Sequence, residues 1–165
     1  MRFRLLMGLV VPIAVAAALP AAAATHPSTS ASGKWYNAGP CTPVAAVPTP
    51  GHPLHADVSC IGSSVWTGTL AGLTDFTMTG HVNLVTDNTD GTVAEVFAGR
   101  MGGKTGAMTF HELVHVDGQT HKLYIVAHKV SGSGAFKDAK VDLVFVGTIT
   151  PATNGFGRYS GTFSL

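Results

Sequence analysis

Glycine recurs at short intervals from Ala56 to the C-terminus. Sixteen of the chain's 20 glycines lie in this part, and the longest interval without one, from Gly118 to Gly132, holds 13 residues. The runs between the glycines are rich in Val, Thr, Phe and Ile, which favour β-strands. Because glycine adopts the positive φ angles that tight turns need, this rhythm predicts many short strands joined by turns.

Eight strands account for the pattern. Turn-forming sequences separate them, among them Asn-Thr-Asp-Gly at 88–91, Asp-Gly at 117–118 and Pro-Ala-Thr-Asn-Gly at 151–155. Short links of this kind join antiparallel neighbours, and only residues 135–139 could form a helical turn. The predicted strands are 56–61, 64–70, 74–86, 92–98, 107–116, 121–130, 140–149 and 157–164.

Eight antiparallel strands without a long helix allow two all-β architectures, a sandwich or a closed up-and-down barrel. Closure into a barrel would remove the exposed edge strands. The last predicted strand runs almost to Leu165, where it could pair with an early strand.

Residues 1–24 have the three parts of a secretory signal peptide. Arg2 and Arg4 form a basic start, residues 5–19 are almost entirely apolar, and residues 21–24 are small alanines at the expected cleavage site. The alternative is a membrane anchor. The apolar stretch is, however, shorter than the roughly 20 residues that cross a bilayer, and no stop-transfer charges follow it. We therefore expect the mature protein to be secreted.

A Ser- and Pro-rich extension, residues 25–55, precedes the predicted barrel domain at 56–165. Residues 25–34 are rich in Ser, Thr and Ala, and we expect them to be disordered or weakly attached. The proline-rich stretch that follows, up to Pro53, cannot form a helix or a central strand. We expect it to run irregularly across the surface of the domain.

Cys41 and Cys60 are the chain's only cysteines. In a secreted protein, two cysteines most simply form one disulfide. The bond would tie the extension to the first predicted strand and contribute about 3 kcal/mol in the chain-entropy model. A zinc site is the alternative, but it would need two further soft ligands, and the chain has no Cys-x-x-Cys pair.

The charge balance argues against nucleic acid as a partner. The chain has 10 Lys and Arg against 9 Asp and Glu. Loss of Arg2 and Arg4 with the signal peptide would leave a formal charge of −1 and no net basic field to attract phosphates. After that cleavage, the chain would hold no apolar segment long enough to cross a membrane.

The string His-Glu-Leu-Val-His at 111–115 matches the zincin motif, in which two histidines on one helical face bind zinc. Here the β-branched residues and the Asp-Gly turn that follows predict a strand. A strand would place His111 and His115 about 13 Å apart, too far to share a metal ion. We expect no metal site here. The chain also lacks the nucleophile elbow, the P-loop and the dinucleotide fingerprint, so no cofactor is predicted.

Glu95 and Glu112 each lie on the apolar side of a predicted strand, with a valine or a phenylalanine two residues away in both directions. A carboxylate on an apolar face must be paired, hydrogen-bonded or raised in pKa. If both point into a barrel, they could act as acid and base or anchor a ligand. Alternatively, each binds a backbone amide, Arg100 or a lysine for structural reasons.

Histidine is frequent, with eight in the chain. If His115 opposes Lys122 across the turn at 117–118, then His111, His115, Tyr124 and His128 share one face of a hairpin. This face could be a metal patch or a pH-sensitive surface. The alternative is an ordinary solvated face of the sheet, since no nearby carboxylate or thiol has the spacing of a metal site.

Five strings combine glycine with turn-forming and aromatic residues in a recurring way. They are Val-Trp-Thr-Gly-Thr-Leu-Ala-Gly at 65–72, Glu-Val-Phe-Ala-Gly at 95–99, Gly-Gly-Lys-Thr-Gly-Ala-Met-Thr-Phe at 102–110, Ser-Gly-Ser-Gly-Ala-Phe at 131–136 and Gly-Arg-Tyr-Ser-Gly-Thr-Phe at 157–163. Together they resemble the bacterial DUF3224-type proteins, which are related to the allene oxide cyclase barrel. The resemblance covers residues 57–165.

The resemblance implies an eight-stranded antiparallel up-and-down barrel with an interior cavity. Relatives of that barrel include cyclases and dirigent-like proteins, which hold a reactive, mostly apolar small molecule in a chosen shape. The usual members are cytoplasmic, whereas this chain has a signal peptide and a Cys-containing extension. These departures argue against an intracellular metabolic role.

Three functions fit these observations. The first is a secreted barrel that binds a small apolar molecule, and the second is an isomerase or cyclase that uses Glu95 or Glu112 as acid or base. The third is an extracellular structural or interaction module with a filled interior. A barrel of about eight strands is at the size where side chains either fill the interior or leave room for one ligand. The cavity therefore discriminates between them: an apolar pocket with both glutamates favours the enzyme, a pocket without acids favours the carrier, and a packed interior leaves the module.

Overall fold

The structure, a computed structural model, describes residues 27–39, 41–150 and 153–165. In these parts the chain forms nine β-strands and no helix, so the predicted all-β class is confirmed. None of the described segments is therefore a helix that could span a membrane. The strands are β1 (Thr29–Asn37), β2 (Thr42–Pro48), β3 (His55–Gly68), β4 (Leu70–Asn83), β5 (Thr89–Met101), β6 (Lys104–Val116), β7 (Lys122–Gly134), β8 (Lys140–Thr150) and β9 (Thr153–Ser164).

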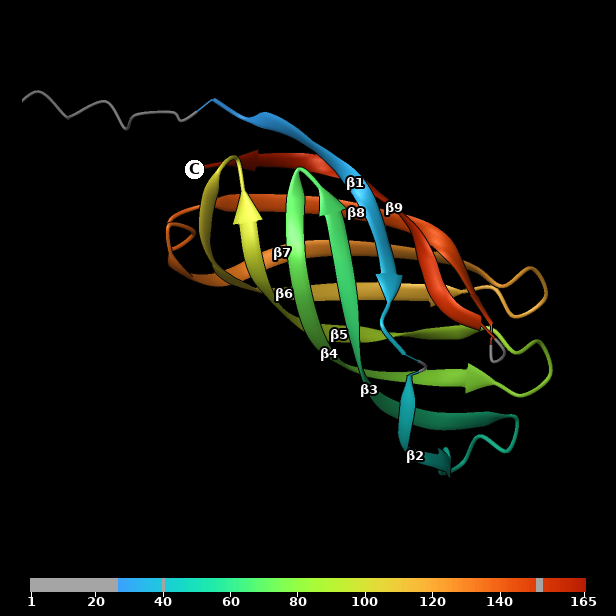
Figure 1. The fold of residues 1–165 in the computed structure, drawn as a ribbon. Helices are drawn as coiled ribbons and strands as arrows, with labels where there is room; N and C mark the ends of the chain where they lie inside the picture. Colours follow the sequence, from blue (N-terminus) through green and yellow to red (C-terminus); the bar gives the residue numbers. More distant parts are fainter. Residues whose placement is uncertain (1–26, 40, 151–152) are drawn as a thin grey trace, which may run out of the picture.

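Strands β3 to β9 form an antiparallel meander in which each strand pairs with the next (Figure 1). β1 pairs with β9 along one edge and with β3 along the other, and this closes the sheet into a barrel of eight strands. β2 pairs with β3 and lies outside the closed ring. The predicted eight-stranded antiparallel barrel is confirmed, including the pairing of the last strand with an early one.

Two of the predicted strands, 56–61 and 64–70, are one continuous strand, β3, which pairs with β4 along nearly its whole length. The sequence interrupts its apolar run with glycine and serine at 62–63. At this point β3 changes partner: its first half pairs with β2 and its second half with β1. The local sequence therefore marks a change of neighbour and not the end of a strand.

The eighth barrel strand is β1, which lies in a segment expected to be disordered or irregular. That expectation is wrong for residues 29–37. Behind the Ser- and Thr-rich composition is a period of two: Ala31, Trp35 and Asn37 face the interior and are buried, while the residues between them are exposed. Pairing along both edges and the burial of Trp35 stabilise a strand that composition alone does not predict.

β2 carries two of the prolines that exclude a central strand, Pro43 and Pro48. It is an edge strand and not the irregular surface segment that we expected, and proline is tolerated at sheet edges. Cys41, just before β2, forms the predicted disulfide with Cys60 of β3, and their Cα atoms lie 5.6 Å apart. A structural disulfide indicates an oxidising compartment. The signal peptide predicted at 1–24 lies outside the described residues and stays a prediction.

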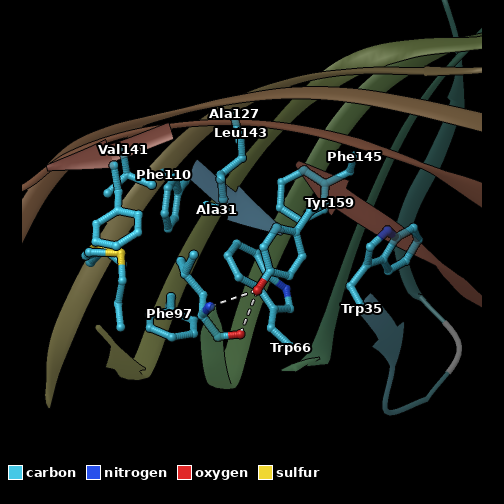
Figure 2. Packing of buried hydrophobic residues seen from close by; sticks show 14 of the residues in the cluster. Ala31, Trp35, Trp66, Phe97, Phe110, Ala127, Val141, Leu143, Phe145 and Tyr159 are labelled. Carbon is cyan, nitrogen blue, oxygen red and sulfur yellow. Dashed lines mark hydrogen bonds between the residues drawn. The ribbon is translucent and has the colours of Figure 1, made fainter. Parts of the chain in front are cut away.

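The packed part of the interior is organised around Trp66 of β3. Its ring lies 5.3 Å from that of Phe97, 5.6 Å from Phe110, 4.9 Å from Phe145 and 5.8 Å from Tyr159, centre to centre. These separations and tilted orientations are favourable for aromatic pairs. Four other strands therefore contact a single indole, which holds the opposite walls of the barrel together (Figure 2).

Tyr159 adds a polar link to this cluster. Its hydroxyl accepts a hydrogen bond from the backbone N–H of Leu70 at 2.8 Å and donates one to the carbonyl oxygen of Leu70 at 2.9 Å (Figure 2). Leu70 begins β4 directly after the tight link from β3, where Gly68 has a φ of 110°. A side chain from β9 thus holds the β3–β4 corner from inside the barrel.

Most glycines of the barrel lie inside strands, which corrects the interpretation of the glycine rhythm as a series of turns. Gly72 of β4 opposes Gly99 of β5, and a Cβ atom added at Gly72 would collide with the carbonyl oxygen of Ala98. Close approach of two backbones at a bend is a usual reason for glycine within a strand. Positive φ angles among the described glycines occur at Gly51, Gly68, Gly102, Gly103 and Gly134.

A second pair of glycines makes room for a side chain. Gly147 of β8 opposes Gly157 of β9. A Cβ atom at Gly147 would lie 2.9 Å from Cζ2 of Trp35, and one at Gly157 would lie 2.8 Å from Nε1 of the same indole. The missing side chains therefore form the recess in which Trp35 lies.

We predict that Gly72→Ala destabilises the fold, because the new methyl group meets backbone and not a flexible side chain. Overpacking of this kind costs about 1–3 kcal/mol. Gly39→Ala is the matched control, since a Cβ there has no atom within 4 Å, and we expect a change within about 0.5 kcal/mol. Urea unfolding of both variants measures the difference. Equal midpoints for the two variants would contradict a steric role for Gly72.

Candidate functional site

The barrel interior is packed at one end and hollow at the other. Trp66 lies at the boundary, since it contacts the aromatic cluster and also lines the cavity. The cavity has about 540 Å³ of unfilled space, its open mouth included. One water molecule in the liquid takes up roughly 30 Å³. The cavity therefore accepts a group of several heavy atoms.

The cavity wall is mostly apolar with a few polar groups. Its apolar side chains come from both halves of the barrel and include Trp35, Trp66, Phe76, Met78, Ile125 and Phe145. Its polar side chains are Asn37, Ser64, Glu95 and Glu112. A concave apolar surface with a small number of polar groups is typical of a small-molecule site. The barrel therefore has an apolar pocket that contains both glutamates, and its interior is not completely filled.

Glu95 and Glu112 reach the cavity from neighbouring strands. Each lies on the inward side of its strand, β5 for Glu95 and β6 for Glu112, and their exposed fractions are 5% and 1%. The register pairs Glu112 with Val93 and Glu95 with Phe110, so the glutamates are diagonal neighbours. Such positions lie roughly 7 Å apart at Cα, within reach of each other's carboxyl groups. The predicted inward placement of Glu112 beside Phe110 is thus confirmed.

The structural alternative for these carboxylates is a bond to a backbone amide, Arg100 or a lysine, and the basic partners lie elsewhere. Arg100 is exposed on the opposite side of β5 from Glu95, and the half-buried Lys129 donates from its Nζ to the carbonyl oxygen of Lys137 at 3.1 Å. No lysine, arginine or histidine of the described chain lines the cavity. The two carboxyl groups therefore have no basic partner among the described residues.

Burial sets the protonation of the pair. It raises the pKa of Glu112 well above its ordinary value of 4.5, and the nearby negative charge of Glu95 raises it further. Burial also raises the pKa of Glu95, but the nearby Glu112 carboxyl and Thr74 hydroxyl oppose that rise. Burial therefore opposes ionisation of both carboxyl groups, and the pKa of Glu112 is raised further than that of Glu95.

Several buried polar atoms around the cavity have no hydrogen-bond partner among the described residues. They are Oε1 of Glu112, Oγ1 of Thr74 and Nε1 of Trp35. Thr74 is close enough to affect Glu95, but no hydrogen bond of good geometry forms between them. Each unsatisfied buried group costs about 1–3 kcal/mol. By contrast, Ser64 Oγ donates to Asn37 Oδ1 at 3.0 Å, so this part of the wall is internally satisfied.

The His-Glu-Leu-Val-His string lies on β6, so the predicted strand is confirmed and the zincin arrangement is excluded. Glu112 points into the barrel, whereas His111 and His115 are exposed on its outer face. Among the described residues, no three ligand-type side chains gather as a metal site would need.

The outer histidines pair with aspartates across strands. His111, His115, Tyr124 and His128 share one face as expected, but His115 opposes Tyr124 and not Lys122, because the turn after β6 is two residues longer at this position than we assumed. His115 contacts Asp90 at 2.7 Å, and His128 contacts Asp142 at 2.6 Å. All four side chains of these ion pairs are exposed, so each pair contributes little to stability.

Sequence reasoning did not identify Trp35 or Asn37 as cavity residues, or Thr74 as a buried neighbour of Glu95. The only signal for Trp35 is its size in a polar segment, and its place in the wall depends on β1 closing the barrel. Thr74 is on β4, the strand next to Glu95, and its burial of 98% follows from the pairing of β4 with β5.

No family model matches this chain, and no curated protein sequence matches it. Among solved structures, its fold is similar to the crystal structure of a DUF3224 family protein of unknown function from Shewanella oneidensis, with a TM-score of 0.65. The two are 17% identical, and the match covers 84% of this chain and 98% of that one. The resemblance inferred from the glycine-rich strings is thus supported by structure: this chain has the fold of a DUF3224 family protein.

Proposed function

We propose that the protein binds a small, mostly apolar molecule in the cavity of its barrel. The observation that carries this proposal is a hollow of about 540 Å³, mouth included, with an apolar wall and an almost fully buried Glu112 whose Oε1 has no hydrogen-bond partner among the described residues. A structural module has no need of either feature, because a filled interior would be more stable. A ligand that fills the space and forms hydrogen bonds with the polar atoms would offset the free-energy cost of the unfilled interior and of the unsatisfied groups.

The size of the cavity limits the ligand. A group of several heavy atoms fits inside, and the open mouth lets the rest of the molecule extend toward solvent. The aromatic wall formed by Trp66, Phe76 and Phe145 offers flat apolar contact. With the disulfide and the predicted signal peptide, we place this binding outside the cytoplasm.

A second candidate function, an isomerase or cyclase, is favoured by the presence of both glutamates in one apolar cavity. Burial raises the pKa of Glu112 further than that of Glu95, so Glu112 would serve as the acid and Glu95 as the base. In such a reaction Glu95 would take a proton from a carbon atom of the ligand, and Glu112 would deliver one at a second position.

We predict that protein purified from its own host carries a small molecule, detected as an added mass by native mass spectrometry. Val93→Phe, which places a ring in the cavity wall, should abolish the added mass. Val96→Phe on the same strand is the matched control, because Val96 is 50% exposed on the outer face, and it should retain the mass. If both variants keep the added mass, the ligand does not bind in the barrel.

We predict that Glu112→Gln makes stability less dependent on pH. The folded state retains a proton that the unfolded chain releases, so between the ordinary pKa of 4.5 and the raised pKa of Glu112 the wild type loses stability as pH rises. The loss is at most about 1.4 kcal/mol per pH unit for one group. In urea unfolding from pH 4 to 8, the free energy of unfolding of the variant should rise relative to that of the wild type as pH rises.

Asp138→Asn is the control for this pH series, because Asp138 is exposed and should leave the wild-type profile unchanged. Parallel profiles for wild type and Glu112→Gln would mean that Glu112 is not held protonated by the fold.

For the isomerase, we predict that the host-derived ligand exchanges carbon-bound hydrogen for deuterium when incubated with the protein in D₂O. Glu95→Gln should slow this exchange by about 10²–10⁴-fold, the usual contribution of a general base. Nuclear magnetic resonance of the ligand follows the exchange. A ligand that binds tightly and exchanges no faster than in buffer would leave the carrier as the function.

A further inference from the structure

We propose that the ligand of the barrel cavity is an organic cation, a primary alkylamine whose ammonium group lies between Glu95 and Glu112. This inference rests on the proposed function and adds the chemical class of the ligand. Three observations carry it: the charge of the cavity, the unpartnered oxygen of Glu112, and the aromatic wall.

The first observation is an unbalanced pair of acids. Glu95 and Glu112 are almost fully buried, and no lysine, arginine or histidine of the described chain lines the cavity. Buried carboxylates are normally paired with a cation or bound to a metal. Here no charged side chain of the described residues does this, so a positively charged ligand would supply the missing partner.

The second observation is the supply of hydrogen-bond acceptors. Oε1 of Glu112 is buried without a partner, in a side chain that is 1% exposed. A primary ammonium group has three N–H donors and no acceptor. It can therefore donate to both carboxylates at once, and such charge-assisted hydrogen bonds are roughly twice as strong as neutral ones.

The third observation is the kind of apolar surface around the acids. Trp35, Trp66, Phe76 and Phe145 line the same cavity. Aromatic faces attract a cation within about 6 Å, most strongly when the cation is out of water. The same surface would contact the hydrocarbon part of an alkylamine. A primary –NH₃⁺ group fits the acids better than a quaternary one, because a quaternary ammonium has no N–H to donate to them.

Other ligand classes fit less well. An anion would be repelled by a glutamate that is ionised. A neutral alcohol could occupy the space and form hydrogen bonds, but it would not compensate the negative charge of an ionised glutamate. A cation satisfies both the charge and the hydrogen-bond requirements.

Amine binding at this site is linked to proton release. Because Glu112 is the more deeply buried acid and no basic side chain of the described residues lines the cavity, the unliganded pair would keep a proton on Glu112, and an ammonium ion that enters between the carboxyl groups would replace it. One proton then leaves Glu112 for the solvent, and the alkylammonium ion stays protonated, so charge is conserved. The titratable groups that line the cavity in the described chain are Glu95 on β5 and Glu112 on β6, since Cys41 is in the disulfide.

Isothermal titration calorimetry with n-butylamine and 1-butanol tests the proposal, because the two probes have the same number of heavy atoms and differ in charge. We expect butylamine to bind at least tenfold more tightly than butanol at pH 7. In two buffers of different ionisation enthalpy, we expect release of close to one proton for each amine bound. The affinity for the amine should fall as pH is lowered toward 4.5, the ordinary pKa of a glutamate.

Two variants localise the effect. The double variant Glu95→Gln, Glu112→Gln should lose the preference for the amine while keeping its weak affinity for butanol, because the apolar cavity is retained. Glu112→Gln alone should bind the amine through Glu95 but release no proton. Asp138→Asn, an exposed acid, should behave like the wild type, and circular dichroism checks that each variant is folded.

Equal affinities for butylamine and butanol would overturn the inference and leave cavity binding in place. A preference for the amine that survives in the folded double variant would also overturn it, because the ammonium group would then bind at a site other than the two glutamates. Failure of the proposed function is a different result: protein from its own host would carry no molecule whose binding depends on Val93.

Discussion

The barrel depends on the pairing of one short strand with two neighbours. β1 joins β9 to β3, and without it both of these strands would present an unpaired edge to solvent. The same strand supplies Trp35, which lies in the recess left by Gly147 and Gly157 and forms part of the cavity wall. The same nine residues therefore close the sheet and form part of the candidate site.

The two ends of the barrel interior differ in packing. At the packed end, Trp66 gathers aromatic rings from four strands, and Tyr159 binds the backbone at the start of β4. This rigid part offsets the cost of the other end, where two acids and several polar atoms are buried without full hydrogen bonding. Stability is concentrated where the barrel is filled, and the unsatisfied groups are concentrated where a ligand can reach them.

The sequence predicts the local features of this protein well. Alternation with a period of two places Glu112 on the inward side of β6 and the two histidines of the zincin-like string on the outward side, because successive side chains of a strand point to opposite faces. Prediction from sequence fails where the structure of a segment is decided by contact with residues far away in the chain. β1 is polar in composition and becomes a strand through β3 and β9, and the glycines of β4 and β5 lie within strands because the opposing backbone approaches closely.

By itself, the sequence determined the all-β class, the disulfide between Cys41 and Cys60, and which side of its strand each glutamate occupies, since these depend on neighbours within a few residues or on cysteine number. Only the tertiary structure decided that the two glutamates are diagonal neighbours, that no described lysine or arginine lines the cavity, and that one end of the interior stays hollow. These properties follow from strand order, register and closure. Those in turn arise from backbone pairing between segments far apart in the chain, which no local pattern encodes.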